Sequence, residues 1–374
     1  MSLLVDLLTV TFLLATFIQL LYWLGIFSRL AFYSAPSPPK PNQALNGISI
    51  IICARNAESQ LRQFLPKILA QKDLLFEVIV VNDHSIDNSE QIILDFQNNY
   101  PNLHLINESD TELPGKKKAL SEGILAAKYE FLLLTDADCF PTTTLWAKSM
   151  ANLFSEKDQV ILGFSPYTRE KSLINYFIRF ETVYTATQYL SFALAGAPYM
   201  GVGRNLAYAK SLFINNQGFE NHLHLASGDD DLFVNQVANY KNTKINLDAA
   251  SFMYSIPKKS WKSYYYQKRR HLTTATSYRP VHQVLLALLA ASHLWHYLGG
   301  LILFAVSPQS LHLILTSYLV RIGVVSFMYW RISTKLEQSD LRFWIPLLDL
   351  FYCLYYVLFA PGLFITGSNH KSWT

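Results

Sequence analysis

The stretch Ile48-Ser49-Ile50-Ile51-Ile52-Cys53 decides the fold class of this chain of 374 residues. A continuous β-branched run that ends in polar residues is typical of a strand buried on both faces of a parallel sheet. Similar runs follow, with helical patterns between them: we expect strands at 77–81, 103–107 and 131–135 and helices at about 57–70, 88–99 and 116–127. Strands that alternate with helices predict an α/β fold with a mostly parallel sheet covered on both faces.

Three polar clusters stand directly after these strands. They are Ala54-Arg55-Asn56-Ala57-Glu58, Asn82-Asp83-His84-Ser85-Ile86-Asp87-Asn88-Ser89 and Asp136-Ala137-Asp138. Ligands of open α/β sheets bind outside the carboxyl ends of the strands, so we expect the clusters to meet in one site. The chain has neither the glycine-rich dinucleotide fingerprint nor the Walker phosphate loop, which excludes those two nucleotide-binding motifs.

The sharpest chemical feature is the pair Asp136 and Asp138, two carboxylates at positions i and i+2. Just past a strand they can bind one hard cation, and Mn²⁺ or Mg²⁺ prefers oxygen ligands together with substrate phosphates. Such a cation neutralises the charge on a departing diphosphate. A turn with two ordinary aspartates is the alternative. Asp83 is suited to accept hydrogen bonds from a nucleotide base, whereas Asp87 and Ser89 suit a turn or a helix N-cap.

A second acidic cluster, Ser227-Gly228-Asp229-Asp230-Asp231-Leu232, supplies candidates for a general base. Transfer of a group to a hydroxyl needs a base that accepts the hydroxyl proton. An acidic helix start is the alternative, and both interpretations are compatible because a helix N-terminus favours carboxylates. Farther along, Gln267 and Arg270 share a helix face and can bind diphosphate oxygens. The neighbouring Lys268 and Arg269 suit a basic anchor at a membrane surface.

Long apolar runs predict about four transmembrane helices. They are residues 3–27, about 283–306, 311–330 and 343–366. The first run is too long for a signal-peptide core, and no basic residue precedes it. Basic residues follow the first run, precede the second and separate the third from the fourth, whereas the link between the second and third carries no charge. The positive-inside rule therefore predicts a cytoplasmic segment 30–280, with both chain ends outside.

These boundaries divide the chain into a transmembrane helix at 1–29, a linker at 30–45, a cytoplasmic domain at 46–280, and three transmembrane helices with a short tail at 281–374. Prolines make the linker stiff. The segment 170–195 alternates polar and aromatic residues, and a helix at the membrane interface or a helix packed in the core explains it equally well. His293 and His296 suit contacts with other helices more than a functional role.

Composition argues against other classes of protein. Only 16% of the residues are charged, against about 25% in a soluble domain. The net charge is +4 with no block of like charges, so nucleic acid is not an expected partner. The three cysteines form no CxxC pair, which argues against a zinc site or a disulfide framework and suits a reducing compartment.

Taken in order, the motifs resemble those of the family 2 inverting glycosyltransferases with the Rossmann-like A-type nucleotide-sugar fold. Within that family they are similar to the membrane-bound branch of cellulose, chitin and hyaluronan synthases and ceramide glucosyltransferase. The resemblance covers about residues 46–275. It implies a nucleotide-sugar donor, a divalent cation (Mn²⁺ or Mg²⁺) and a single displacement that inverts the anomeric configuration.

The resemblance also implies a role for each matching residue. The nucleotide would be contacted by Ala54, Arg55, Asn56, Glu58, Asp83, Lys116 and Asp136, with Asp83 at the base. The metal would be bound by Asp138, more directly than by Asp136. The donor sugar, the acceptor or the diphosphate would be contacted by Gly203, Asn205, Gln267 and Arg270. Asp230 would be the general base, with Asp229 beside it.

Two positions depart from the family pattern. Ala57 separates Asn56 from Glu58, where many members have Glu directly after the Asn. His271 replaces the Trp of the family's Q-x-x-R-W motif, which helps the synthases to hold the end of a growing polymer. This departure argues against processive synthesis.

We therefore predict transfer of one sugar, from a UDP-sugar rather than a GDP-sugar, to a lipid or lipid-linked acceptor at the cytoplasmic face of a bacterial inner or plasma membrane. Membrane lipids would be further partners. A processive polysaccharide synthase is the alternative enzyme. A non-catalytic transporter or scaffold is the alternative of another class. A transporter is expected to show paired repeats and charges inside its spans, and we identify neither.

Overall fold

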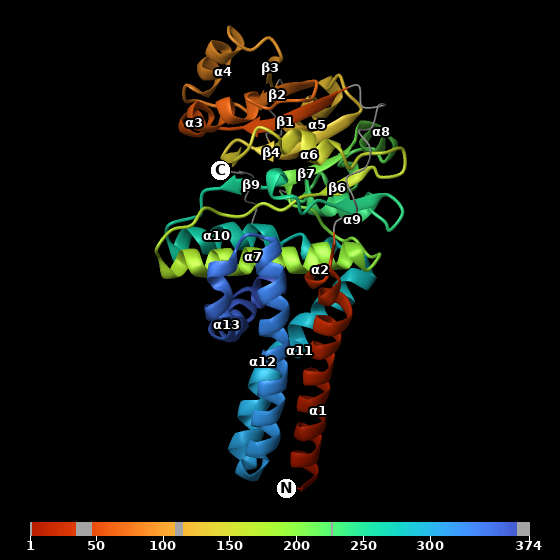
Figure 1. The fold of residues 1–374 in the computed structure, drawn as a ribbon, viewed down its shortest axis with the longest axis vertical. Coiled ribbons are helices and arrows are strands. Elements are labelled where there is room, and N and C mark those ends of the chain that lie inside the picture. Colours follow the sequence, from red (N-terminus) through yellow and green to blue (C-terminus); the bar gives the residue numbers. More distant parts are fainter. Residues whose placement is uncertain (1, 35–46, 109–114, 226, 365–374) are drawn as a thin grey trace.

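The computed structural model describes residues 2–34, 47–108, 115–225 and 227–364. Most of the predicted linker and the predicted C-terminal tail lie outside these residues. Figure 1 shows a sheet domain at one end of the molecule, helices α7 and α10 across its middle, and long helices that run to the other end.

A seven-stranded sheet forms the centre of the domain, in the order β3-β2-β1-β4-β7-β6-β8. Its strands are β1 (Ile48–Ala54), β2 (Phe76–Asn82), β3 (Leu103–Asn107), β4 (Phe131–Asp136), β6 (Val160–Leu162), β7 (Leu206–Ala209) and β8 (Thr243–Ile245). β1 pairs in parallel with β2 and β4, and β2 pairs in parallel with β3. The predicted mostly parallel sheet is therefore confirmed.

The sequence did not predict the second half of the sheet. β7 runs antiparallel to both β4 and β6, and β5 (Cys139–Pro141) pairs with β9 (Met253–Ser255) in a separate small sheet. These strands have three or four residues each. A run that short shows no recognisable period in the sequence.

Burial on both faces explains the apolar run of β1. Ile51 and Cys53 pack in the cluster that contains residues of α5, whereas Ile50 and Ile52 pack in the cluster that contains residues of α3 and α6. The helices of the domain are α3 (Glu58–Leu69), α4 (Ser89–Gln97), α5 (Lys116–Ala126), α6 (Trp146–Ala151), α7 (Leu173–Leu194), α8 (Lys210–Asn215), α9 (Asp231–Val237) and α10 (Trp261–Leu272).

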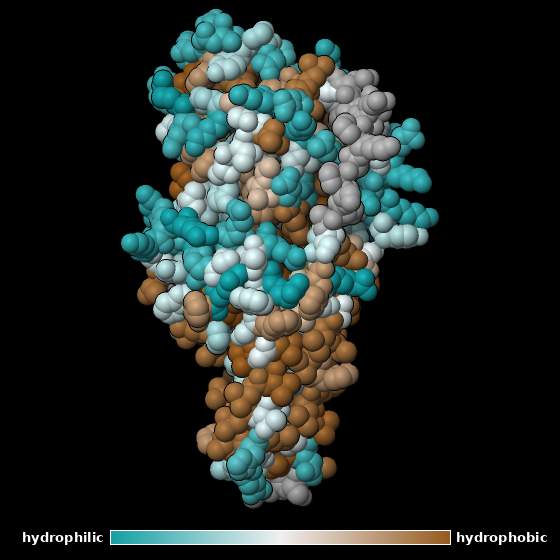
Figure 2. Space-filling view, in the orientation of Figure 1, coloured by the Kyte–Doolittle hydropathy of each residue, from teal (hydrophilic) through white to brown (hydrophobic). Residues whose placement is uncertain are grey.

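Four helices among the described residues are long and apolar enough to cross a membrane, at Leu3–Ala31, Pro280–Val306, Pro308–Lys335 and Ser339–Phe359. The first comprises α1 (Ser2–Leu21), a π-helical segment (Tyr22–Phe27) and α2 (Ser28–Ala31); the others contain α11 (Pro280–Val306), α12 (Leu311–Lys335) and α13 (Ile345–Phe364). Figure 2 shows a hydrophobic surface over this part and a mixed, largely hydrophilic surface over the sheet domain. The expectation of about four such helices is confirmed.

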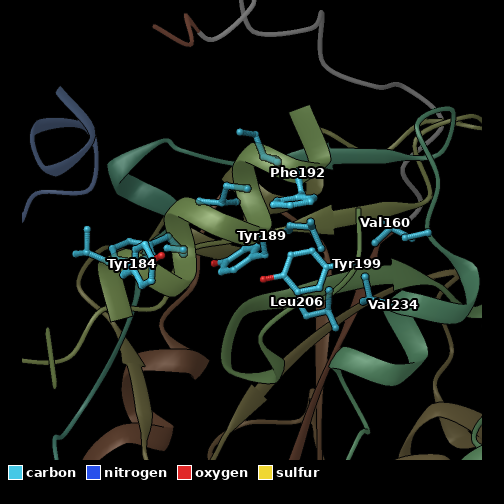
Figure 3. Packing of buried hydrophobic residues seen from close by; sticks show 14 of the residues in the cluster. Val160, Tyr184, Tyr189, Phe192, Tyr199, Leu206 and Val234 are labelled. Carbon is cyan, nitrogen blue, oxygen red and sulfur yellow. The ribbon is translucent and has the colours of Figure 1, made fainter. Parts of the chain in front are cut away.

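Helix α7 connects the two parts, and most of its side chains are buried. Tyr189 and Phe192 pack with Tyr199 and Leu206 under the sheet (Figure 3). The ring of Tyr184 lies against that of Tyr352, with centroids 4.7 Å apart. Packing within the protein thus explains the aromatic residues of 170–195. Contact of this segment with lipid remains a prediction.

Contrary to the sequence-based expectation, the long helices contain a buried ion pair. Arg321 of α12 lies with Nη1 2.5 Å from Oδ2 of Asp349 in α13, and both side chains are almost fully buried. Gln19 of α1 accepts from Arg321, and Tyr297 of α11 donates to Asp349. One charged residue hardly lowers the mean hydropathy of a long run, so the pair becomes evident only when the helices are assembled.

This pair gives a test of how the helices are held together. Arg321→Leu leaves the Asp349 carboxylate buried without its cation, which costs about 3–5 kcal/mol. We expect a matching fall in the free energy of unfolding in detergent, measured by denaturant titration. The double variant Arg321→Leu/Asp349→Leu should recover much of the loss, because no lone charge remains. A single variant as stable as the native chain would contradict the role of the pair.

Candidate active site

The carboxyl ends of β1 and β4, the first turn of α5 and the first turn of α9 meet at one edge of the sheet. Their side chains line one small cavity together with the segment that enters β7: among the lining residues are Cys53, Lys116, Asp136, Gly203, Asp229 and Asp230. Residues that are far apart in the sequence, such as Cys53 and Asp230, therefore share one space. Asp136 of the third strand-end cluster and Asp229 and Asp230 of the acidic cluster 227–232 thus line the same cavity.

Lys116 lies between the two acidic clusters. Its Nζ atom is 2.9 Å from Oδ1 of Asp136 and 2.8 Å from Oδ2 of Asp229. Burial opposes the charge of the ammonium, but the two carboxylates raise the pKa of Lys116 well above its usual value. Burial likewise opposes ionisation of Asp229, yet Lys116 keeps the pKa of that carboxyl low. Both partners are therefore charged at neutral pH.

Asp230 is the N-cap of α9 and faces the cavity. Its Oδ2 accepts a hydrogen bond of 2.6 Å from the backbone N–H of Gly203, and its Oδ1 accepts one of 2.7 Å from Asp231 N–H. Burial and the neighbouring charges of Asp229 and Asp231 raise the pKa of Asp230 to about 7. A carboxylate with a pKa near the working pH is suited to accept a proton.

The close approach of Gly203 to Asp230 leaves little room for a side chain at position 203. A Cβ at Gly203 would lie 3.2 Å from Oδ2 of Asp230. The sequence-based expectation was that Gly203 lines the sugar or acceptor; the observed neighbour of its N–H is the carboxylate of Asp230.

Asp231 and Lys117 hold the acidic segment in place. The carboxylate of Asp231 accepts hydrogen bonds from the hydroxyls of Thr274 and Tyr278, which ties α9 to the segment before α11. The buried Lys117 donates from Nζ to the carbonyl oxygens of His222 and Leu225. Burial lowers the pKa of Lys117 to about 8. Sequence reasoning missed Lys117, because a lysine beside Lys116 and Lys118 gives no sign of its burial.

Asp136 and Asp138 fit the requirements of a cation site. Ligand atoms of Asp136, Asp138 and Cys139 all lie within 4.8 Å of one another. The Cys139 thiol donates to Oδ1 of Asp138 at 3.2 Å. Burial and the charge of Asp136 raise the pKa of Asp138. Two carboxylates that repel each other in this way can share a hard cation, and their oxygen atoms suit Mn²⁺ or Mg²⁺.

The second polar cluster of the sheet edge surrounds Asp83. His84 Nδ1 is 2.9 Å from Oδ1 of this fully buried carboxylate, and Arg55 Nη1 is 3.6 Å from its Oδ2. Glu108 also belongs to the cluster. Burial and the Asp83 charge raise the pKa of Glu108 to about 7. His84 and Glu108 are further candidates that the sequence analysis did not select.

The remaining residues of the predicted nucleotide site shape the loops around it. Ala54 ends β1. Asn56 accepts from the N–H of Ile86, and Glu58 accepts from Asn88. Asp87 accepts from the N–H of Glu58 at the start of α3, and Ser89 accepts from that of Ala57. Asp87 also accepts from the N–H of Ser89, as in the expected turn, whereas the N-cap residue of α4 is Asn88.

Asn205 lies beneath the site and is fully buried. Its amide donates to the carbonyl oxygens of Phe164 and Ser251, and its Oδ1 accepts from the indole N–H of Trp146. These bonds occupy the side chain within the protein. The geometry therefore gives Asn205 a positioning role instead of the predicted contact with substrate.

Gln267 and Arg270 occur on α10, and Nε2 of Gln267 is 3.4 Å from the hydroxyl of Tyr167. The Tyr167 ring also carries the guanidinium of Arg204, 4.4 Å from its centroid. Arg204 donates to the carbonyl oxygen of Ser165. Burial opposes the charge of the Arg204 guanidinium, but the neighbouring acidic groups, among them the carboxylates of Asp138 and Asp136, raise its pKa above the usual value. Arg204 was not predicted, although it stands between the predicted residues Gly203 and Asn205.

The geometry thus defines a Rossmann-like domain. Carboxylates suited to bind a divalent cation lie at its strand ends, as in a nucleotide-dependent transferase. Residues 49–215 match the model of Glycosyl transferase family 2. The chain therefore carries a family 2 glycosyltransferase domain.

Curated relatives and solved structures agree with this class. The chain is 36% identical over 98 residues to a poly-β-1,6-N-acetyl-D-glucosamine synthase of Staphylococcus epidermidis (26% of this chain, 23% of the relative). It is 29% identical over 128 residues to the dolichyl-phosphate β-glucosyltransferase ALG5A of Trichomonas vaginalis (30% and 39%). The chain thus spans well under half the length of these relatives.

Among solved structures, a mannosyltransferase of Pyrobaculum calidifontis in complex with GDP-Man and Mn²⁺ has a similar fold. The TM-score is 0.59 at 17% identity, and the match covers 94% of this chain and 99% of that one. Since its coverage extends beyond residues 49–215, the likeness includes the long apolar helices.

Arg204 provides a test of the site. A planar guanidinium beside the Asp136–Asp138 pair is suited to bind diphosphate oxygens of a donor. Loss of a charge-assisted hydrogen bond costs about 1.5–3 kcal/mol, so we expect Arg204→Gln to raise the donor KM by about tenfold or more. Arg204→Lys should lose less, because it keeps the charge but not the stacking on Tyr167. The matched control is Lys157→Gln at an exposed position after α6; equal KM values for Arg204→Gln and this control would contradict the assignment.

Proposed function

We propose that the protein transfers one sugar from a nucleotide-sugar, with a UDP-sugar favoured, to a hydroxyl of a lipid or lipid-linked acceptor at the cytoplasmic face of a membrane, with inversion of configuration. The observation that carries the proposal is the convergence of Lys116, Asp136, Asp229 and Asp230 on one cavity at the strand ends. The family 2 domain gives the reaction class.

Each residue would have a separate task in this reaction. Asp136 and Asp138 would hold a divalent cation, which supplies charge neutralisation for the departing nucleoside diphosphate. Lys116 keeps Asp229 ionised, and this charge in turn raises the proton affinity of Asp230. Asp230 would accept the proton of the acceptor hydroxyl as that oxygen attacks the anomeric carbon. Arg55, Asn56, Glu58 and Asp83 would surround the nucleotide.

The long apolar helices support the proposal that the acceptor is a lipid. They also support a division of the chain into domains at about residues 29, 45 and 280. The name of the curated dolichyl-phosphate β-glucosyltransferase includes a lipid phosphate, which agrees with an acceptor of this kind. The basic residues of α10 would then lie at the cytoplasmic surface, as the positive-inside rule requires.

A polysaccharide synthase is the second candidate function. The match to a poly-β-1,6-N-acetyl-D-glucosamine synthase favours it. Two features favour single transfer: His271 stands where processive synthases have Trp, and buried side chains such as Gln19, His296 and Arg321 fill the space between the long helices. Side chains that fill the space between the described helices do not favour the passage of a polymer through one chain.

The proposal is tested by the release of nucleoside diphosphate from a panel of UDP- and GDP-sugars by the detergent-solubilised full chain, with Mn²⁺ or Mg²⁺ and lipid extracts. We expect metal-dependent release from one donor. Asp138→Ala should lower the rate by at least about 100-fold, and Asp230→Asn by about 10²–10⁴-fold. Asp95→Asn on the exposed face of α4 is the matched control.

Product length separates the two candidate functions in the same assay. A single added sugar on a lipid supports transfer, whereas long polymer formed from donor alone would establish the synthase. Release that persists in both Asp138→Ala and Asp230→Asn would contradict the assigned site.

The pH profile gives an independent test of Asp230. A general base works in its ionised form, and the pKa of Asp230 is raised to about 7 by burial and by its acidic neighbours. We therefore expect kcat to rise with pH between about 6 and 8 and to level off above. Residual activity of Asp230→Asn should lack this rise. A profile that is flat from pH 5 to 8 in the native chain would exclude Asp230 as the group that titrates.

A further inference from the structure

Helix α13 stays beside the helices that cross the middle of the molecule. Directly before α13, the ring of Trp344 lies 5.8 Å from that of Tyr176 in α7. In the middle, Tyr352 lies 4.7 Å from Tyr184, also in α7. Near the last side chains described, Phe359 stacks on Tyr265 of α10 at 5.1 Å. These contacts tie successive parts of α13 to the same α7–α10 layer.

The rise of a helix makes this pattern informative. At 1.5 Å per residue, the path from residue 344 to residue 359 covers about 22 Å. A helix that left the layer toward the far side of a membrane would carry Phe359 about that far from α7 and α10. Figure 1 shows α13 nearly end-on beneath α7, whereas α1 and α12 run along the long axis of the molecule.

Helix α12 shows what a crossing helix looks like in this structure. At its last turn, Lys335 donates to the carbonyl oxygen of Tyr33, close to the sheet domain. Toward its other end, Ile314 packs with Phe12 of α1 and Leu303 of α11 in a separate cluster. Among the described residues, α13 contributes no member to that far cluster.

The side chains of α13 form stripes that suit a helix lying flat. One stripe is buried and includes Ile345, Leu348, Tyr352, Tyr355 and Phe359. Asp349 on another face reaches Arg321 of α12 and Tyr297 of α11. The outward stripe is apolar and exposed, with Leu347, Leu350, Phe351, Leu354, Val357 and Leu358 all at least 44% exposed.

We propose that α13 lies in the plane of the membrane, under α7 and α10, with its outward stripe docked in the hydrocarbon of the leaflet nearest the sheet domain. The chain then crosses the membrane with three helices, α1, α11 and α12, although α13 has the length and composition of a fourth. The far end of α13 lies on the same side as the sheet domain, in contrast to the external C-terminus expected from the sequence.

The lipid leaflet is the occupant that fits this surface. The residues of the outward stripe are all apolar, as is most of the surface of the long helices in Figure 2. Aromatic side chains at the rim, Trp261, Tyr266 and Trp344, are each at least 44% exposed, and Trp and Tyr concentrate at membrane–water interfaces. The ion pair of Asp349 with Arg321 fixes the buried side of α13, so that the apolar stripe points outward.

Depth measurements test this arrangement. Single cysteines replace Leu347, Phe351, Leu354 and Leu358, one per variant, and carry a nitroxide label in phosphatidylcholine–phosphatidylglycerol vesicles. The three natural cysteines are buried, and the unmodified chain gives the background. The matched control series is Leu315, Leu319 and Phe327 on the exposed face of α12.

For α13 we expect all four labels to lie at a shallow depth. Their depths should differ by no more than ~5 Å, which is about the radius of a helix with its side chains. For α12 we expect depth to change by about 1.5 Å per residue. A steady change of that size along α13, reaching the bilayer centre, would overturn the proposal.

Sidedness provides a second readout that does not depend on depth calibration. In sealed vesicles of known orientation, a membrane-impermeant maleimide should reach a cysteine that replaces Thr374, beyond α13 in the sequence, only from the side of the sheet domain. Labelling from the opposite side alone would likewise overturn the proposal. Neither readout depends on catalysis, so a failure of the proposed transferase function would leave the result interpretable.

Discussion

The contact of Lys116 with Asp136 and Asp229 is the interaction on which the rest of the site depends. One ammonium joins the acidic motif at the end of β4 to the acidic start of α9, although the two carboxylates are far apart in sequence. Without this cation, the carboxylates of Asp136, Asp229 and Asp230, which line one small cavity, would repel one another. Because Lys116 holds Asp229 ionised, the next carboxylate, Asp230, is left with a raised pKa. Lys116 thus gives two adjacent aspartates different roles: Asp229 stays ionised, and Asp230 can accept a proton.

Packing of α7 connects the site to the long apolar helices. The tyrosines of α7 pack under the sheet on one side and against the long helices on the other. Core residues of the sheet, of α7 and of the long helices therefore belong to one hydrophobic cluster. Asp231, next to the proposed base, is bonded to Tyr278 just before α11. An acceptor held in the leaflet would therefore approach a base whose position is set by the membrane helices themselves.

Much of the fold could be predicted from the sequence, because β1, β2, β4 and the long helices are continuous apolar runs of clearly different length. The polar clusters at the strand ends predicted Asp136 for the site, a base requirement suggested Asp229 and Asp230, and the family resemblance implied Lys116. The short strands β5 to β9 carry too few residues for a pattern. Lys117, Arg204 and Glu108 depend on burial and on partners distant in sequence, and the Arg321–Asp349 pair depends on how helices meet. Asn205 resembled a substrate ligand because a motif does not show which side chains are already bonded.

The stereochemistry of sugar release tests the central claim most directly. In this account Asp230 deprotonates an attacking hydroxyl on the face opposite the nucleoside diphosphate, in a single displacement. With an α-linked nucleotide-sugar and water or acceptor as nucleophile, proton NMR at early times should detect the β-anomer or β-glycoside first. The native chain should form it in a metal-dependent reaction, and Asp230→Asn should not. Initial formation of the α-anomer would contradict the account, because it requires a second displacement that Asp230 as a base does not provide.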